Sequence, residues 1–183
     1  NLKLSIVKMK IGLIFLSLLI TFNSYSQNLP EVEITQSWLN KIEAMVEGKK
    51  RLAPSKKKNL LIFSLHTGYN HWTIPHTEEV IKIIALKTGD FNVEVSKDIS
   101  VFEKKNISKY DVIVLNNNCS DRERRDMFWD VMNENKFLDE EQVIDKAKKL
   151  EKNLLKHIKR GNGLVVLHGA IVMQNNSLDF SAM

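Results

Sequence analysis

Histidine carries the clearest chemical signal in this chain of 183 residues. Four of its five histidines follow soon after apolar runs of strand length, and these are His66, His71, His76 and His168. An imidazole gains or loses a proton near neutral pH, which suits it to general acid–base catalysis. Two imidazoles that meet at one molecule could move a proton at a carbon next to a carbonyl group. We therefore predict His71 and His168 as catalytic residues, while a core histidine that caps a strand is the alternative for His168.

The same loops hold side chains suited to a sugar. The candidate substrate-binding residues are Tyr69, Asn70 and Trp72 in one loop and Asn116 and Asn117 in another. Side-chain amides donate to and accept from hydroxyl groups, and aromatic rings stack on the apolar face of a sugar ring. In the structural alternative, the asparagines cap strand and turn groups and the aromatic rings pack over the domain edge.

Metal and thiol chemistry are less well supported. The spacing of His66, His71 and His76 matches no known zinc pattern, so we name no metal-binding residues. The sequence does not identify a cofactor, and a metal ion is possible but not favoured. The single cysteine, Cys119, excludes an internal disulfide framework. No basic residue is fixed beside it in sequence, which favours a passive thiol over a nucleophile.

Strand-like and helix-like segments alternate from residue 59 onward. Continuous apolar runs predict buried strands at 60–65, 110–115 and 163–167, and an alternating pattern predicts an edge strand at 91–95. Helical periodicity predicts helices at 75–87, 126–135 and 140–160. This is an α/β pattern, a doubly wound parallel sheet in the order 2-1-3-4 with helices on both faces and the continuous runs at its centre. Ligands bind at the carboxyl ends of such strands, where the histidine and asparagine loops lie.

The N-terminus reads as an export signal. From Met9, the predicted true start, Lys10 precedes an apolar run at 11–22 and small polar residues near 24–26. The apolar run is shorter than the roughly 20 residues that span a bilayer, so we predict a signal peptide over 1–26 rather than a membrane anchor. No cysteine lies near the cleavage point to carry a lipid. We expect a periplasmic or secreted protein with no stable membrane span after cleavage.

Residues 27–58 form a lead-in segment, with a predicted short helix at 37–46 and a basic linker at 49–58. The formal net charge of +5 falls when residues 1–26 are removed, which leaves 24 basic and 22 acidic residues. The basic linker has no interleaved aromatic residues for base stacking. We therefore predict no nucleic-acid partner.

Several short motifs together resemble the ThuA-like (trehalose utilisation) family, within the class I glutamine amidotransferase-like superfamily. They are Ser64, Gly68 to His71 with Ile74-Pro75, Asp98 with Val101-Phe102, Tyr110 to Val114, and Gly161 to Ala170. The resemblance implies a flavodoxin-like domain over 59–183 and a link to sugar metabolism. The family continues past the fourth strand, so we expect a domain that is incomplete, or C-terminally truncated, at Met183.

One position departs from the superfamily pattern. Amidotransferases carry a nucleophilic cysteine on the sharp turn after the fourth predicted strand, and here His168 and Gly169 occupy that turn. An imidazole cannot form the thioester that glutamine hydrolysis requires, so we predict that the protein is not a glutamine amidotransferase. The stretch 122–139 interrupts the family pattern and is predicted to be an insertion beside the pocket.

Two functions from different classes fit these observations. The first is an exported protein of carbohydrate utilisation that acts on a sugar or an oxidised sugar derivative by an isomerase-like or lyase-like step. The alternative is a non-catalytic carbohydrate-binding module of the same fold. Both predict a small-molecule carbohydrate as partner, and both are compatible with a homo-oligomer.

Overall fold

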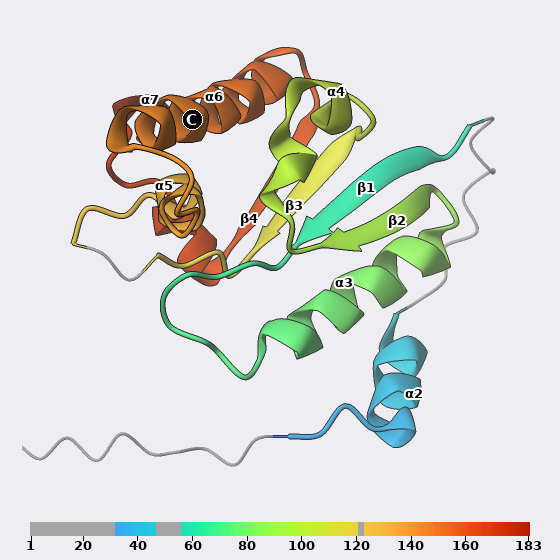
Figure 1. The fold of residues 1–183 in the computed structure, drawn as a ribbon. Helices are drawn as coiled ribbons and strands as arrows, with labels where there is room; N and C mark the ends of the chain where they lie inside the picture. The colour runs from blue at the N-terminus through green and yellow to red at the C-terminus, as the bar shows by residue number, and fades with distance from the viewer. Residues whose placement is uncertain (1–31, 47–55, 121–122) are drawn as a thin grey trace, which may run out of the picture. The chain divides into compact units, whose positions relative to one another are not determined.

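In the computed structural model, which describes residues 32–46, 56–120 and 123–183, four strands form one parallel sheet. The strands are β1 (Lys58–Phe63), β2 (Phe91–Ser96), β3 (Val112–Asn116) and β4 (Gly163–Leu167). Their order is β2-β1-β3-β4, with Leu60 opposite Val93 and Val112 in the neighbouring strands (Figure 1). The predicted sheet order 2-1-3-4 is confirmed, and with it the flavodoxin-like α/β arrangement.

The helices were also largely predicted. The longer ones are α2 (Gln36–Met45), α3 (Ile74–Thr88), α5 (Met127–Asn133) and α6 (Glu140–Lys159). The short ones are η1 (Ile99–Phe102), α4 (Lys104–Ile107), η2 (His168–Val172) and α7 (Leu178–Ser181). Elements of four or five residues are too short to show a periodic pattern, which is why the sequence did not reveal the second group.

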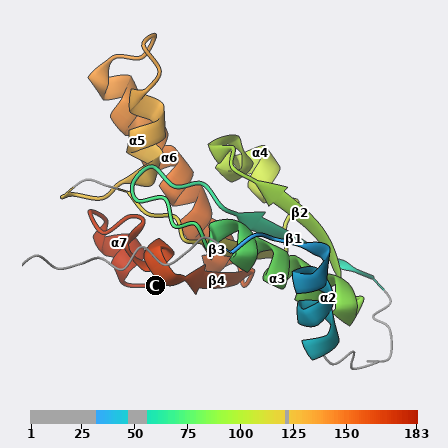
Figure 2. The same cartoon turned by 90° about the horizontal axis from the view of Figure 1, so that it is seen from below.

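The two central strands are buried on both faces. Leu61 and Phe63 of β1 point into the larger core cluster, where they meet Phe128 of α5 and Leu154 of α6. Because successive side chains of a strand point to opposite faces, Leu60 and Ile62 join a second cluster with Ala85 of α3. Helix α3 thus covers one face of the sheet, and α5 and α6 cover the other (Figure 1). Figure 2 shows the sheet from the side of α3. This two-sided burial explains why β1 reads as a continuous apolar run.

Strand β4 corrects one expectation. The continuous apolar run 163–167 predicts a central strand, but within the described residues β4 pairs with β3 alone and lies at the sheet edge. Val165 of this strand is 43% exposed. None of the residues of β4 is buried within the described part of the chain, so its apolar run does not mark a strand buried on both faces there.

Helix α6 has the strongest local signals in the domain. Asp139 accepts from the Gln142 backbone amide while the Gln142 side chain accepts from the Asp139 amide, which forms a capping box. Gly161 follows the helix with a φ of 91°, a conformation that favours glycine. These end signals account for the close agreement with the predicted 140–160.

Residues Ile34–Met183 form one unit. The predicted signal peptide over 1–26 lies outside the described residues. None of the helices in the described part of the chain has the length and apolar character needed to cross a membrane.

Candidate functional site

The loops that follow β1 and β3 are fastened to each other. The Asn118 side-chain amide donates to the carbonyl oxygens of Phe63 (3.1 Å) and Leu65 (2.7 Å), at the end of β1. The carbonyl oxygen of Cys119 accepts from the Gly68 backbone amide at 2.8 Å. Asn118 is fully buried, so these contacts hold the loop after β1 against the interior of the domain.

Asp130 of α5 also links the loops that follow β1 and β3. Its Oδ2 accepts from the Thr67 hydroxyl and from the Ser120 hydroxyl, each at 2.6 Å. Hydrogen bonds to a carboxylate are shorter and stronger than neutral ones. The predicted insertion therefore contributes a helix that anchors the loops around the candidate site.

The two predicted catalytic histidines lie next to each other. The ring centroids of His71 and His168 are 4.7 Å apart with an interplanar angle of 87°. Tyr69 packs edge-on against His71 with centroids 4.5 Å apart, and its side chain is 65% exposed. The fold thus joins residues that are nearly 100 positions apart in the chain, at the carboxyl edge of the sheet.

The environment of His71 disfavours its charged form. Burial of its ring lowers the pKa from the ordinary value of 6.5, and the positive charges that His168 and His66 can carry lower it further. His71 is therefore mostly neutral at pH 7, with one ring nitrogen free to accept a proton.

The turn at His168 is strained and supported by Asn117. Both residues have left-handed backbone conformations, with φ of 50° at His168 and 60° at Asn117. Such values are uncommon for residues other than glycine, and asparagine tolerates them best. Asn117 Oδ1 lies 2.6 Å from His168 Nδ1 and accepts from the Gly169 backbone amide at 3.2 Å.

These contacts define the tautomer of His168. The Gly169 amide can only donate, so the Asn117 atom that faces it is the carbonyl oxygen. An amide oxygen can only accept, so His168 Nδ1 must carry a proton. In the neutral imidazole, Nε2 then carries no proton and is the atom that can accept one.

Gly169 leaves the room that this arrangement needs. A Cβ at this position would lie 3.3 Å from Asn117 Oδ1 and 3.3 Å from the Cys119 Cβ. These distances are tighter than ordinary van der Waals contacts, so a larger residue would press on the acceptor that holds His168. The Cys119 Sγ itself makes a long hydrogen bond to the Ser120 carbonyl oxygen, at 3.5 Å.

The two predicted sugar-binding asparagines lie under the surface. Asn116 is fully buried and donates to the Ser64 hydroxyl (3.0 Å) and to the Ile74 carbonyl (3.1 Å). Asn117 is 5% exposed and is occupied by the His168 turn. Their positions match the structural alternative, in which asparagines satisfy strand-end groups, rather than direct contact with a ligand.

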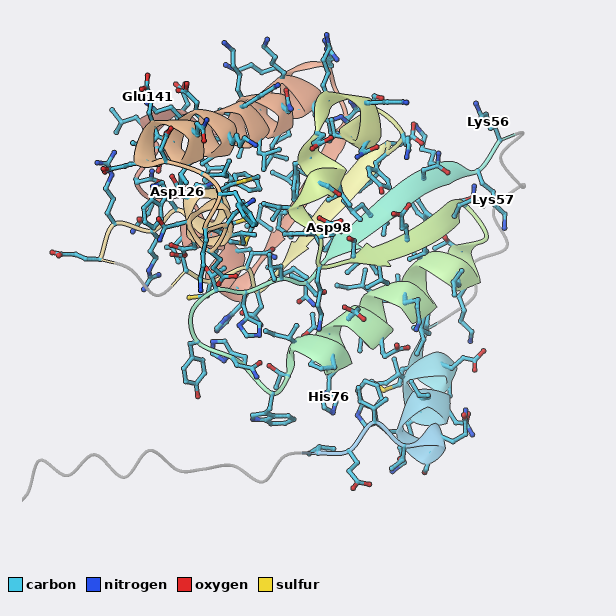
Figure 3. The ribbon with its side chains drawn as sticks, viewed as in Figure 1. Lys56, Lys57, His76, Asp98, Asp126 and Glu141 are labelled. Atoms are coloured by element: carbon cyan, nitrogen blue, oxygen red, sulfur yellow. The ribbon has the colours of Figure 1, made fainter. Side chains whose placement is uncertain are left out.

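Trp72 and His76 belong to a different cluster. The His76 ring meets Trp38 of α2 and Trp72 edge-on, with centroids 5.2 Å apart in each case. Figure 3 shows His76 at the start of α3, close to α2. The Trp72 ring therefore packs over the edge of the domain, which was the structural alternative to stacking on a sugar. Asn70, by contrast, is exposed in the loop next to Tyr69.

Two further observations describe the surroundings. A groove of about 340 Å³ lies at the same edge of the sheet, lined by His66, Gly68, Lys97 and Asp98 among others. Across residues 32–46, 56–120 and 123–183, no three His, Cys, Asp or Glu side chains gather as a group that could hold a metal ion.

Sequence reasoning placed the histidines together but missed two supporting residues. Asn117 was predicted to bind substrate, and Asp130 was not singled out. For Asn117 two signals in the sequence indicate a structural role: asparagine is favoured in left-handed turns, and a buried strand directly precedes this residue.

Comparison with known proteins gives one match. The model of a family described as ThuA, trehalose utilisation, matches residues 59–183. No curated protein and no solved structure matches the chain.

Proposed function

The chain belongs to the ThuA (trehalose utilisation) family, and from that membership we propose that it acts on a sugar or an oxidised sugar derivative by acid–base chemistry. The observation that carries the proposal is the edge-on pair of His71 and His168, 4.7 Å apart at the carboxyl edge of the sheet. General acids and bases work within hydrogen-bond reach of the same ligand, and adjacent imidazoles satisfy that requirement.

The two histidines have different roles in this proposal. His71, whose pKa burial lowers, is neutral at pH 7 and accepts a proton from the carbon next to a sugar carbonyl. The electron pair of that C–H bond forms the enol double bond. His168, in its protonated form, donates the Nε2 proton to the carbonyl oxygen while Nδ1 stays bound to Asn117. In an isomerase-like step, His71 returns its proton to the former carbonyl carbon while Nε2 of His168 takes the proton of the neighbouring hydroxyl, which becomes the new carbonyl. In a lyase-like step, Nε2 of His168 takes back the enol proton, the carbonyl re-forms, and the oxygen substituent on the next carbon leaves with the proton held by His71 as a carbon–carbon double bond forms.

Exposed side chains of the β1 loop would contact the sugar. Tyr69 is in van der Waals reach of His71 and is largely exposed, and Asn70 beside it is exposed as well. The groove lined by His66, Lys97 and Asp98 extends the same edge and would accept a second ring. Asn116 and Asn117 then act beneath the surface, as supports for the loop and for His168.

We also propose that the protein is exported to the periplasm or secreted, and that its partner is a small-molecule carbohydrate. The support for export is the sequence of residues 1–26, which has a basic start, an apolar run and small residues before its end. Fractionation of cells that express the chain tests this proposal, and an antibody to the domain should detect the protein in the periplasmic or secreted fraction.

The function is tested by turnover of trehalose that carries a ketone in one ring. We expect the intact chain to convert it, and a His71→Gln/His168→Asn double variant to lose at least about a hundredfold in rate. His76→Gln is the matched control, because this histidine lies in the aromatic cluster with Trp38 and Trp72. Retained turnover in the double variant would refute the acid–base proposal. Saturable sugar binding without any product would support the non-catalytic binding module instead.

A further inference from the structure

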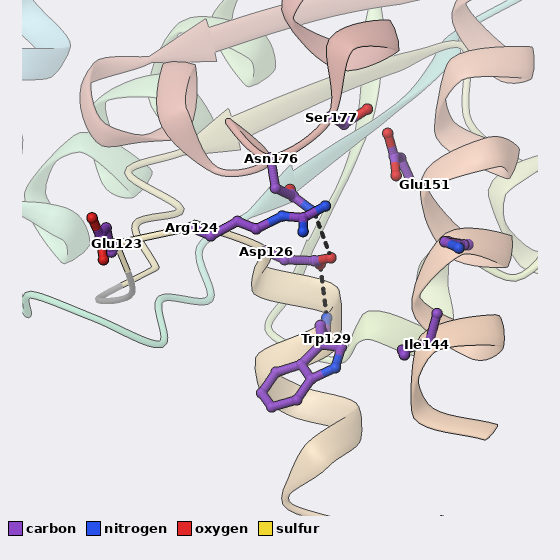
Figure 4. Close-up of a pocket in the computed structure, with 9 residues that line it drawn as sticks. Glu123, Arg124, Asp126, Trp129, Ile144, Glu151, Asn176 and Ser177 are labelled. Atoms are coloured by element: carbon purple, nitrogen blue, oxygen red, sulfur yellow. Dashed lines mark hydrogen bonds between the residues drawn. The ribbon is translucent and has the colours of Figure 1, made fainter. Parts of the chain in front are cut away.

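A second cavity lies apart from the histidine pair. It has a volume of about 750 Å³ and lies between the start of α5, helix α6 and the segment before α7 (Figure 4). The side chains that matter most for its chemistry are Asp126, Trp129, Ile144, Glu151, Asn176 and Ser177. Ligand pockets in proteins commonly have volumes of about 300–1,000 Å³. We propose that this cavity is a second carbohydrate-binding site, which holds a different sugar unit from the one at His71 and His168.

The lining suits an uncharged, hydroxyl-rich ring. Trp129 and Ile144 supply an apolar wall against which the C–H face of a sugar can pack. Asp126 and Glu151 supply acceptors, and Lys148 supplies a donor. The lining also holds Glu123 and Arg124, so acidic and basic side chains are mixed and positive charge is not in excess. A site without an excess of positive charge does not favour an anion, so a neutral carbohydrate is the class that fits best.

The polar wall is held in place before any ligand arrives. Asp126 accepts from the Trp129 backbone amide at 2.9 Å and from the Asn176 side-chain amide at 3.0 Å, as the dashed lines in Figure 4 show. The Asn176 backbone amide also donates to the Arg125 carbonyl at 3.3 Å. A site whose groups are already fixed loses less entropy on binding.

The Asn176 side chain in this wall has one unsatisfied polar atom. The Asn176 nitrogen is used by Asp126, and its Oδ1 is buried without a hydrogen-bond partner among the residues that the structure describes. A buried carbonyl oxygen left unsatisfied costs free energy unless water or a ligand donates to it.

Glu151 adds a group able to donate. Burial raises its pKa, and the carboxylates of Asp126 and Asp179 raise it further. A hydrogen bond with Ser177 and the charge of Lys148 act in the opposite direction. Glu151 therefore keeps its proton to a higher pH than an exposed glutamate does. A carboxyl accepts from a sugar hydroxyl in either protonation state and donates to a sugar oxygen only when it is protonated.

The cavity and the histidine pair are connected by the same two chain segments. Asn117, in the loop after β3, contacts His168 beside the histidine pair, and Asp126, at the start of α5, accepts from Asn176 in the wall of the cavity. This arrangement is expected for two binding sites on one extended carbohydrate. That reading rests on the function proposed for the histidines, whereas binding at the cavity does not.

Calorimetric titration of the intact chain with maltotriose and with trehalose tests the proposal. We expect saturable binding of at least one sugar, weakened about tenfold or more by Trp129→Ala and less by Trp129→Tyr, which keeps an aromatic wall. Phe137→Ala is the matched control, because Phe137 is 96% exposed and outside the cavity lining. Circular dichroism checks that each variant is folded.

The outcome separates this site from the histidine pair. We expect the His71→Gln/His168→Asn double variant to keep the binding that depends on Trp129. The proposal is overturned if neither sugar binds, or if the folded Trp129→Tyr and Trp129→Ala variants both bind like the parent chain. It is also overturned if the double histidine variant removes all binding, and that result would leave the proposed function intact.

Discussion

The side-chain oxygen of Asn117 accepts both from Nδ1 of His168, at 2.6 Å, and from the backbone amide of Gly169, at 3.2 Å. The second contact orients the amide, and the first then places a proton on Nδ1. An acceptor behind a catalytic histidine keeps the opposite nitrogen aimed at its ligand, as carboxylates or carbonyls do behind many functional histidines. Asn117 thus holds the ring of His168 in one orientation.

The tautomer of His168 should depend on Asn117. In the parent chain we expect ¹⁵N NMR of the imidazole to show a proton on Nδ1 in the neutral form. Asn117→Ala removes the acceptor, so the Nε2–H tautomer should gain population and turnover should fall about 10- to 100-fold. A His168 spectrum unchanged in Asn117→Ala would contradict this role, whatever the effect on turnover.

The pKa of His71 should rise when His168 is replaced. Burial is the largest cause that lowers it from 6.5, and the charge of His168 is the next. His168→Asn removes that charge and tolerates the left-handed backbone, while burial remains. Proton NMR titration should therefore show a His71 pKa that is higher than in the parent chain but still below 6.5.

His66→Gln is the matched comparison for that titration. The charge of His66 also lowers the pKa of His71, but it is the smallest of the three causes. Its replacement should raise the pKa of His71 by less than His168→Asn does. The reverse order would show that the two rings are not adjacent in solution.

The carboxylate of Asp130 should stabilise the loops after β1 and β3. Asp130→Ala leaves the hydroxyls of Thr67 and Ser120 without the oxygen to which both donate. We expect the free energy of unfolding to fall by about 2–4 kcal/mol, measured by urea denaturation. Asp145→Ala, an exposed position on α6, should change it by less than about 0.5 kcal/mol.

Burial of His157 should make stability depend on pH. Burial lowers its pKa from 6.5, the charge of Arg160 lowers it further, and Asp111 raises it. The unfolded chain then binds a proton more readily than the folded chain, so stability should fall as the pH drops below 6.5 toward the folded-state pKa. Urea denaturation at pH values of about 7.5 and 5.5 should show a smaller difference for His157→Gln than for the parent chain. An equal difference in both proteins would contradict the assignment to His157.

The strands and the histidine pair could be predicted because each depends on local patterns and on topology. The runs around Leu61 and Ile113 indicate two buried strands, and parallel strands bring the loops with His71 and His168 to one edge. For Asn116 and Trp72 the sequence left a binding role and a structural role open, and it could not decide between them. Their roles depend on tertiary contacts with Ile74 and His76, and sequence spacing does not show which side of a loop faces the core.

The most direct test of the account is proton exchange at the sugar itself. Trehalose with a ketone in one ring is incubated with the chain in D₂O, and deuterium at the carbon beside the ketone is followed by mass spectrometry. Incorporation should be fast with the parent chain, and slow with His71→Gln and with His168→Asn, while His76→Gln should match the parent. Equal incorporation by the parent chain and the two site variants would contradict the claim that His71 and His168 transfer protons on one sugar.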